Sequence, residues 1–434
     1  MKIKTEKKYD IVIVGGNIFS AQLAVQLANI ELKLLLISHS DISDCSDNFF
    51  IETLNSYKPK QNHEFYSSYS HSVIPTDVFI LNNTNVLDSV SKKIQSVVRK
   101  KLISKKDFKN YEKTLITKAN ITIKKEKSYK ISYSRLCIDT IKTAKATKLD
   151  ILSYTSIKEL KTGKIIINSG KEIKADLIIN TDFSLLEDEL KNSVVTTENY
   201  IFTIPKFVLN IKNPLKIIDK NTINIIPYFS EIFICSDNKK TDIIIDKIKN
   251  NIGIEINKKL IIKEHIVRKY NSNILSRTKK IIHVFENDYH NNKEKINYVL
   301  SEVLNLLSLE TADYKEYKLS TSFNIQADKY NFIRMLEQGY LQVQETGVTP
   351  NEYTVLFYRY GNDLEKITEK AYDFYNDKET RKHAWLYAEL WYSVNYEFVK
   401  TPDDFIYRRT NFGLINQLDD EKREIITNFI DNAK

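Results

Sequence analysis

The sequence predicts an α/β chain that ends in an all-α domain, and three observations carry this prediction. Residues 9–15 form a continuous apolar run, which is typical of a strand buried on both faces. Residues 18–30 place apolar side chains along one side of a helix, and residues 32–38 form a second apolar run. After about residue 320 the apolar spacing is mostly helical. A chain of 434 residues is too long for one ordinary core, so we expect two or three domains.

The segments between these ends alternate in character. From residue 59 to about 115, apolar residues between Leu87 and Leu102 recur near helical spacing with lysines opposite. That pattern predicts either a helix on a membrane surface or a domain helix with a solvated basic face. Residues 131–183 predict a helix, a strand, a hairpin with turns at Thr162-Gly163 and Ser169-Gly170, and a buried strand. Strands dominate residues 199–235, and a helix is predicted at 291–308.

Composition narrows the function classes. The chain has a net charge of +9, which suits an acidic partner such as a phosphorylated substrate, a membrane surface or nucleic acid, or simply a solvated surface. Three cysteines without CxxC spacing indicate a reduced, cytosolic protein without a disulfide framework or zinc site. We expect no signal peptide and no membrane-spanning segment. Only 9 glycines occur, which argues against a large nucleotide site.

Residues 9–38 predict a strand–turn–helix–strand unit of the kind that opens dinucleotide-binding folds. A phosphate-binding turn of this kind has glycine at the positions of residues 15, 17 and 20, and this turn instead reads Gly15, Gly16, Asn17 and then Ser20. Asn17 places a side chain where a phosphate would approach, although asparagine accepts positive φ well enough for the turn to persist. Ser38 replaces the acid that should end the second strand. We interpret these residues as a vestigial cofactor site.

A stretch near the C-terminus carries a family resemblance. Residues 388–416 contain a set of paired motif residues at characteristic spacing: Ala388-Glu389, Tyr396-Glu397, Thr401, Asp404-Phe405 and Arg408-Arg409-Thr410. This pattern closely resembles the C-terminal helical domain of FAD-dependent glycerol-3-phosphate dehydrogenases. Thr401 followed by a proline and two acids also predicts a capped helix start.

The resemblance implies a specific architecture. It implies a Rossmann-like FAD/NAD(P)-binding fold of the glutathione-reductase or DAO type, interleaved with a mixed β-sheet substrate domain and followed by a C-terminal all-α domain. We accordingly expect an FAD-binding-like domain from residues 1–58, 116–198 and 275–320. A substrate or cap-like domain would comprise residues 59–115 and 199–274. The helical domain would comprise residues 321–434.

The resemblance is uneven at the cofactor segments. Arg135, Leu136 and Asp139 match an Arg-Leu-x-x-Asp stretch of the family, and Asn180 is kept without the glycine and proline that normally follow it. In the segment that wraps the flavin, the residues with obvious chemistry are replaced by Cys45, Phe49, Glu52 and Asn55. A later Gly-Gly-Lys segment aligns with Glu286-Asn287-Asp288, which replaces a lysine by an acid.

Two arginines resemble those that hold substrate phosphate in the family. They are Arg268 and Arg277, and a guanidinium suits bidentate binding of phosphate. The segment between them is shorter than in the relatives. We therefore weigh a surviving anion site against a surface or structural role for this pair.

The favoured hypothesis is a degenerate glycerol-3-phosphate dehydrogenase homologue, a pseudoenzyme that has lost FAD and acts as a binding or regulatory protein. The alternative is an active FAD-dependent enzyme that oxidises glycerol 3-phosphate to dihydroxyacetone phosphate and passes electrons to quinone or oxygen. A third interpretation, a basic protein at a membrane surface or on nucleic acid, depends on charge alone. The four cofactor segments have lost glycines or gained acids together, which favours the first hypothesis.

No other catalytic constellation replaces the lost one, so the catalytic residues are unassigned. The 7 histidines show no metal-ligand spacing, and we expect no metal. For partners we expect a protein or a second copy of the chain, a phosphorylated small molecule, or peripheral membrane contact, and no nucleic acid. The resemblance implies a cytoplasmic protein, either free or on the inner face of the membrane.

Overall fold

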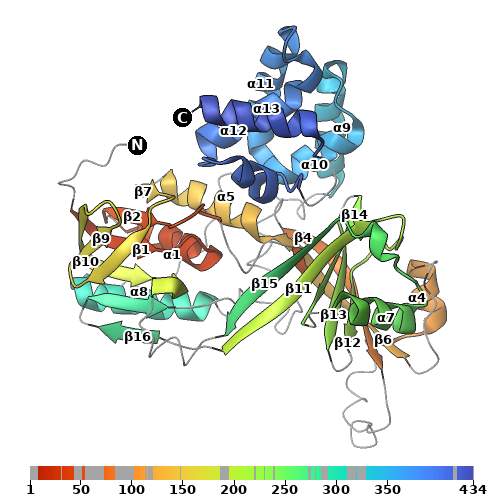
Figure 1. The fold of residues 1–434 in the computed structure, drawn as a ribbon, viewed down its shortest axis with the longest axis horizontal. Helices are drawn as coiled ribbons and strands as arrows, with labels where there is room; N and C mark the ends of the chain where they lie inside the picture. Colours follow the sequence, from red (N-terminus) through yellow and green to blue (C-terminus); the bar gives the residue numbers. More distant parts are fainter. Residues whose placement is uncertain are drawn as a thin grey trace, which may run out of the picture.

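The structure is a computed structural model of the 434-residue chain. It describes residues 8–433 except 31, 44–50, 54–72, 84–101, 113–114, 116–120, 147, 186–194, 219–220, 229, 238–239, 272–274, 279, 285–291, 310–318, 320–328 and 414–417. Figure 1 shows two sheets side by side with a helical domain above them. The helix predicted between Leu87 and Leu102 lies almost wholly outside the described residues.

The first sheet carries the predicted strand–turn–helix–strand unit. Within the described residues it has eight strands, with the path β16-β17-β10-β1-β2-β7 and the hairpin β8–β9 attached to β10. The strands are β1 (Tyr9–Val14), β2 (Leu34–Ile37), β7 (Leu149–Leu152), β8 (Ile157–Lys161), β9 (Lys164–Ile167), β10 (Glu172–Asn180), β16 (Leu275–Thr278) and β17 (Ile281–Val284). Strand β1 is parallel to both neighbours, β10 and β2. This is the parallel arrangement expected for a doubly covered sheet.

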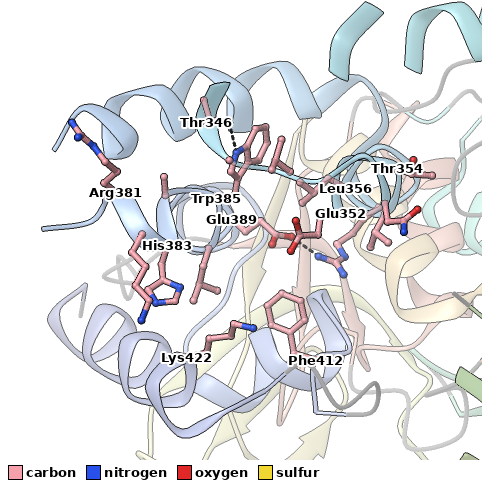
Figure 2. A pocket seen from close by; sticks show the side chains of 18 of the residues that line it. Thr346, Glu352, Thr354, Leu356, Arg381, His383, Trp385, Glu389, Phe412 and Lys422 are labelled. Carbon is pink, nitrogen blue, oxygen red and sulfur yellow. Dashed lines mark hydrogen bonds and ion pairs between the residues drawn. The ribbon is translucent and has the colours of Figure 1, made fainter. Parts of the chain in front are cut away.

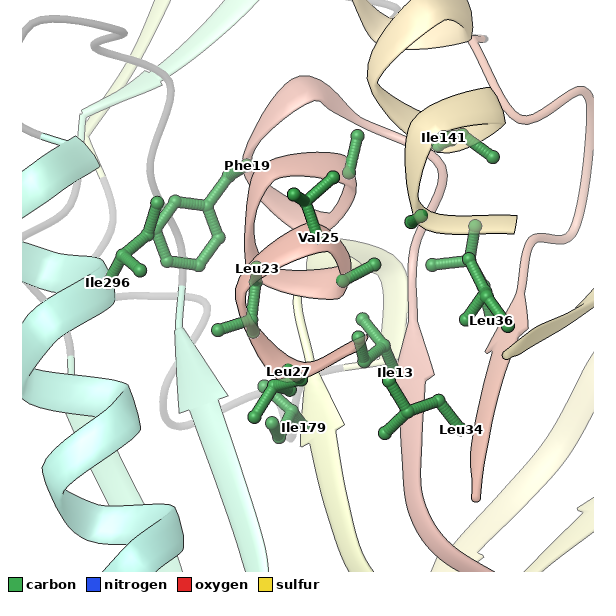
Figure 3. Close-up of a cluster of buried hydrophobic side chains, with 14 of the residues drawn as sticks. Ile13, Phe19, Leu23, Val25, Leu27, Leu34, Leu36, Ile141, Ile179 and Ile296 are labelled. Carbon is green, nitrogen blue, oxygen red and sulfur yellow. The ribbon is translucent and has the colours of Figure 1, made fainter. Parts of the chain in front are cut away.

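Three helices cover one face of this sheet. They are α1 (Ile18–Ala28), α5 (Tyr133–Lys145) and α8 (Asn292–Leu307), and they enclose one hydrophobic cluster with β1, β2 and β10 (Figure 3). Ile13, Leu23 and Leu36 are fully buried in it. Helix α1 lies between the sheet, α5 and α8, so nearly all of its side chains are buried. This burial explains why the helix has no solvated polar face. The opposite face of the sheet packs against the β8–β9 hairpin.

The second sheet is the larger one and is mainly antiparallel. Within the described residues it has nine strands, in the order β15-β11-β14-β13-β12-β4-β6-β3, with β5 paired to β6. Its strands are β3 (Ile51–Thr53), β4 (Val73–Asn83), β5 (Leu102–Ile103), β6 (Ile121–Ser132), β11 (Val195–Pro205), β12 (Leu215–Ile218), β13 (Thr222–Tyr228), β14 (Glu231–Ser236) and β15 (Lys263–Asn271). Helices α4 (Lys105–Tyr111) and α7 (Thr241–Ile252) contribute to its hydrophobic core.

The C-terminal part is helical, as the sequence predicts. It contains α9 (Lys329–Val343), α10 (Pro350–Tyr360), α11 (Leu364–Asn376), α12 (Ala384–Tyr396), the π-helical turn Asp404–Arg409 and α13 (Asp420–Asn432). Leu386 and Leu390 of α12 are buried in one hydrophobic cluster, and Val394 is partly buried in the same cluster. Phe398 instead packs on the core of the first sheet and adopts a positive φ of 63°. The mixed sheets and the C-terminal helical domain confirm the predicted fold class.

The predicted domain boundaries remain a prediction, and strand membership departs from them at β3 and β6. Both strands belong to residue ranges assigned to the FAD-binding-like domain, yet both pair within the nine-stranded sheet. The reason is local: β6 is a long strand that pairs along its length with β4 and then leads directly into α5. The chain therefore crosses between the two sheets within one continuous strand–helix segment.

Candidate functional site

The turn between β1 and α1 requires a glycine at position 15. Gly15 has a φ of 130°, a conformation that L side chains rarely adopt. A Cβ at this position would lie 2.0 Å from the Thr181 hydroxyl, which itself donates to the carbonyl of Val14. The first glycine of the turn is thus required by both its φ and the close approach of the segment that follows β10.

The helix N-terminus in this turn is capped by the chain itself. Asn17 is the N-cap of α1, and its side-chain oxygen accepts from the Ser20 amide at 2.9 Å. The Ser20 hydroxyl in turn donates to the Asn17 carbonyl at 2.7 Å. The first backbone N–H groups of a helix are the donors that a phosphate group uses at such a site. One of these donors is therefore already engaged by Asn17.

Asn17 corrects one expectation from the sequence. Its tolerance of positive φ was the expected reason for the survival of the turn, but its φ is −91° and its ψ is 173°. This extended conformation is the usual one for an N-cap residue. The turn persists because Gly15 supplies the positive φ and Asn17 supplies the cap.

The loop after β2 lies directly on the turn. A Cβ on Gly16 would be 2.6 Å from the Ser38 hydroxyl oxygen and 2.8 Å from the Asp41 carbonyl oxygen. The Ser38 hydroxyl donates to that same Asp41 carbonyl at 3.1 Å, and Ser38 is 2% exposed. The residue at the position of the ribose-binding acid is consequently a buried serine whose hydrogen bond holds its own loop closed.

An ion pair joins the two loops that flank β1 at its carboxyl end. His39 follows β2 and Asp182 follows β10, and both strands are neighbours of β1. Their side chains meet with His39 Nδ1 at 2.8 Å from the Asp182 carboxylate. Burial alone would raise the pKa of Asp182, but its bonds to His39 and Ser184 hold the pKa below its usual value. The carboxyl ends of such strands are where open α/β sheets bind ligands.

Asp41, in the loop after β2, anchors the C-terminal domain. Arg409 donates to both Asp41 carboxylate oxygens, at 2.6 and 2.9 Å, and both side chains are fully buried. Arg408 adds a third contact at 2.9 Å, and Ser43 a fourth at 2.9 Å. Burial would raise the pKa of Asp41, but Arg409 and Arg408 lower it below the usual value. We call Asp41, Arg408 and Arg409 the Asp41 clamp.

A second buried contact joins α5 to the helical domain, and Figure 1 shows α5 running beneath that domain. Arg135 pairs with Asp139 one helical turn away and with Glu397 at 2.5 Å. All three side chains are at most 4% exposed. Farther along α5, Lys142 pairs with Asp363 at 2.6 Å. The Arg-Leu-x-x-Asp stretch thus binds the C-terminal domain through Arg135.

The charged residues of the C-terminal motif share one role. Glu389 pairs with Arg359, Glu397 with Arg135 and Asp404 with Arg408, while Arg408 and Arg409 both bind Asp41. These are contacts within the helical domain or from it to the first sheet. The motif that carries the resemblance is therefore built from buried ion pairs.

The structure places the two predicted phosphate-binding arginines on different sheets. Arg268 is in β15 of the nine-stranded sheet, opposite Glu198 of β11, and Arg277 is in β16 at the edge of the eight-stranded sheet. Their side chains lie outside the described part of the chain, so their shared phosphate site remains a prediction. Residues 45, 49, 55 and 286–288 also lie outside it, and only the backbone of Glu52 is described, in β3.

Sequence reasoning missed Asp41 and Asp182. Asp41 belongs to a polar stretch with several acids, and its arginine partners lie 367 and 368 positions away. The available signal was the adjacent pair Arg408-Arg409, because an arginine that is buried in the fold requires an acid partner. Among the described residues, no helix is long and apolar enough to span a membrane, and no group of His, Cys, Asp and Glu could hold a metal.

Comparison with known proteins shows a family match for the C-terminal part and a fold similarity for the whole chain. Residues 327–431 match the family model of the C-terminal domain of alpha-glycerophosphate oxidase. No curated protein sequence matches the chain. Its structure is similar to that of glycerol-3-phosphate dehydrogenase from Bacillus halodurans complexed with FAD, with a TM-score of 0.77, 16% identity, and coverage of 99% of this chain and 95% of that one.

Two further solved structures share the fold over a smaller part of the chain. L-alpha-glycerophosphate oxidase from Mycoplasma pneumoniae with FAD bound has a TM-score of 0.54 and 12% identity, covering 72% of this chain and 99% of that one. Glycine oxidase from Geobacillus kaustophilus has a TM-score of 0.52 and 11% identity, covering 73% and 99%. Residues 327–431 therefore match a C-terminal domain of the alpha-glycerophosphate oxidase type, and the chain as a whole shares the fold of these solved structures.

Proposed function

We propose that this chain is a degenerate relative of the FAD-dependent glycerol-3-phosphate dehydrogenases that has lost FAD and acts by binding. The observation that carries the proposal is the bond from the Ser20 amide to the Asn17 side chain. A dinucleotide pyrophosphate needs those N-terminal donors and needs the backbone to be approachable at the position of Asn17. Here a side chain fills the approach and consumes a donor.

Two further observations support the loss of FAD. The residue at the end of β2 is Ser38, whose hydroxyl is engaged by the Asp41 carbonyl, so no carboxylate stands there to bind the ribose hydroxyls. Across the carboxyl end of β1, His39 and Asp182 are joined by an ion pair. These bonds among the described residues at the carboxyl end of β1 support the proposal that the chain does not bind a dinucleotide.

In this proposal the protein acts through its surfaces, by pairing with another protein or with a second copy of itself. The motif residues retained in the helical domain are consistent with that role, because their buried ion pairs maintain the arrangement of domains rather than redox chemistry. The phosphorylated ligand of Arg268 and Arg277, the cytoplasmic location and the contact with a membrane face are further parts of the proposal.

The second candidate is an active FAD-dependent glycerol-3-phosphate dehydrogenase. The observation that favours it is the fold similarity over 99% of the chain to a structure complexed with FAD. The two candidates differ in two measurable properties of the purified full-length protein. These are the visible absorption of bound flavin and the oxidation of glycerol 3-phosphate with an artificial electron acceptor.

The experiment records the visible spectrum of the protein as purified and then assays oxidation with and without added FAD. We expect a colourless protein that melts cooperatively and shows no oxidation above the rate without protein. A flavin band that stays with the protein through desalting, together with turnover, would establish the second candidate instead.

A further inference from the structure

The helical domain contains a cavity whose lining includes no residue of the β1–α1 turn. Its volume is about 620 Å³, and its lining comes from α10, α12, α13 and the segments beside them. Ser230, in the turn between β13 and β14, also lines it, so the cavity lies where the helical domain meets the nine-stranded sheet. This volume falls within the range of roughly 300–1,000 Å³ that is usual for small-molecule sites, which often lie between domains.

Apolar and aromatic side chains form much of the wall. Trp385 and Leu386 of α12 contribute from one element, Val355 from α10, and Phe412 from the segment after the π-helical turn. The Trp385 indole N–H donates to the Thr346 hydroxyl at 2.8 Å, which fixes the ring orientation (Figure 2). A fixed indole and a phenyl ring offer flat apolar surfaces to a ligand.

The charged lining is mainly cationic. Four cationic side chains line the cavity against two acids; the cations are Arg359, Arg381, Lys382 and Lys422, and the acids are Glu352 and Glu389. His383 is a further lining residue. Figure 2 shows Lys422 near Phe412, with His383 on the same side of the space. The local field therefore favours an anion over a cation.

Both acids are already engaged by the fold. Glu352 accepts from the Thr349 amide at 2.9 Å and from the Thr349 hydroxyl at 2.8 Å, which completes the capping box of α10. Glu389 accepts from the buried Arg359. A cationic ligand would have to compete with these bonds.

The cations differ in how far the protein neutralises them. Lys382 is 2.6 Å from each carboxylate oxygen of Glu421, which reduces its charge toward the cavity. Lys422 forms a longer ion pair, with Asp419 at 3.5 Å, and its side chain is 33% exposed. Because an ammonium has three donors, Lys422 can bind a ligand anion while keeping its contacts within the protein.

We propose that this cavity binds a small organic anion whose apolar or aromatic part packs against Trp385 and Phe412 while its anionic group pairs with Lys422. The inference uses no residue of the nucleotide turn and does not depend on the loss of FAD. A failure of one proposal therefore leaves the other standing.

The test uses two fluorescent probes and the full-length protein. Anilinonaphthalene sulfonate is an aromatic anion, and phenylnaphthylamine is its neutral counterpart without the sulfonate. Titrations compare the wild type with Lys422→Met, with Val355→Trp, which fills the cavity without changing charge, and with Lys158→Met. Lys158 is an exposed lysine on β8, remote from the cavity, and serves as the matched control for charge.

We expect saturable binding of the anionic probe to the wild type. Lys422→Met should raise its Kd by roughly three- to tenfold, the loss of one partly exposed charge-assisted contact, and should change the Kd of the neutral probe much less. Val355→Trp should weaken both probes, and Lys158→Met should weaken neither. If Val355→Trp does not fold, the comparison of Lys422→Met with Lys158→Met still decides. Equal weakening by these two lysine variants, or no saturable binding to the wild type, would overturn the proposal.

Discussion

The glycine turn and the Asp41 clamp are neighbours, because the loop after β2 lies on the turn and contains Asp41. The two regions nevertheless use their side chains in opposite ways. In the turn, Asn17 and Ser20 bond to each other through local contacts three residues apart. In the clamp, Asp41 binds arginines more than 360 positions away; Asp41 and Arg409 are fully buried, and the Arg408 side chain is 12% exposed. The conformation of the turn therefore depends on local hydrogen bonds. The clamp instead contains ion pairs whose loss would leave charges buried without partners.

This difference indicates what each region contributes to the stability of the folded protein. A helix N-terminus without a phosphate can be capped by one asparagine. The contact between the helical domain and the loop after β2 cannot be replaced by a local bond, because the buried Arg409 requires Asp41 as its partner. Substitutions in the two regions should therefore differ sharply in their effect on stability.

The largest effect should follow from Asp41→Ala. It leaves Arg409 fully buried without its bidentate partner, and breaking a buried pair in this way typically destabilises a protein by about 3–5 kcal/mol. Urea-induced unfolding followed by circular dichroism measures the change. Glu172→Gln, which breaks an exposed pair with Lys164, is the control and should leave the midpoint unchanged. An equally small shift for both variants would contradict the importance of the clamp.

Glu397→Gln should have the next largest effect. Arg135 loses a charged acceptor but keeps Asp139, so we expect a destabilisation of about 2 kcal/mol, in the range for a hydrogen bond to a charged group. The same unfolding measurement applies. A loss as large as that of Asp41→Ala would mean that Asp139 does not hold Arg135 alone.

A smaller effect is expected in the turn. Asn17→Ala removes the cap oxygen and should destabilise the protein by about 1 kcal/mol, whereas Asn17→Gly should change stability by only a few tenths of that. Comparing the two variants separates the cap from the backbone. If Asn17→Gly were as damaging as Asp41→Ala, the turn would carry more of the stability than the comparison allows.

The smallest effect concerns pH. The pKa of Asp182 is lowered in the folded protein, so its stabilising contribution is present above the ordinary Asp pKa of about 3.9 and is lost as the pH falls through the lowered value. Because His39 is largely exposed, we expect less than about 1 kcal/mol. Unfolding measured at about pH 6 and about pH 3 should show a steeper loss for the wild type than for Asp182→Asn. Equal losses of stability for the two proteins would mean that the His39–Asp182 ion pair does not contribute to stability.

Much of the fold could be predicted from the sequence because its signals are local. We could predict β1 and β2 because each is a short apolar run, and α1 because its apolar residues have helical spacing. All three elements are buried in the structure. The turn residues Gly163 and Gly170 adopt the positive φ values that mark the hairpin ends. The crossing of β6 between sheets could not be predicted, because pairing partners of a strand depend on the whole sheet.

The sequence identified five residues of the candidate site, but it missed Asp41 and Asp182 and did not identify the contacts. The glycine pattern identified Gly15, Gly16, Asn17, Ser20 and Ser38, and all five lie together in the structure. The role of Asn17 as a cap and the closure by His39 and Asp182 depend on side chains that meet only after folding. Neither spacing nor composition contains that information.

The most direct test of the central claim is a titration of FAD into the full-length wild-type protein, followed by flavin fluorescence, beside Asn17→Gly. We expect no saturable change for the wild type, because Asn17 engages the Ser20 amide and fills the approach to the turn. Any binding that appears should appear in Asn17→Gly, where both obstacles are removed. Saturable binding of one FAD per wild-type chain would mean that the protein has kept its cofactor site.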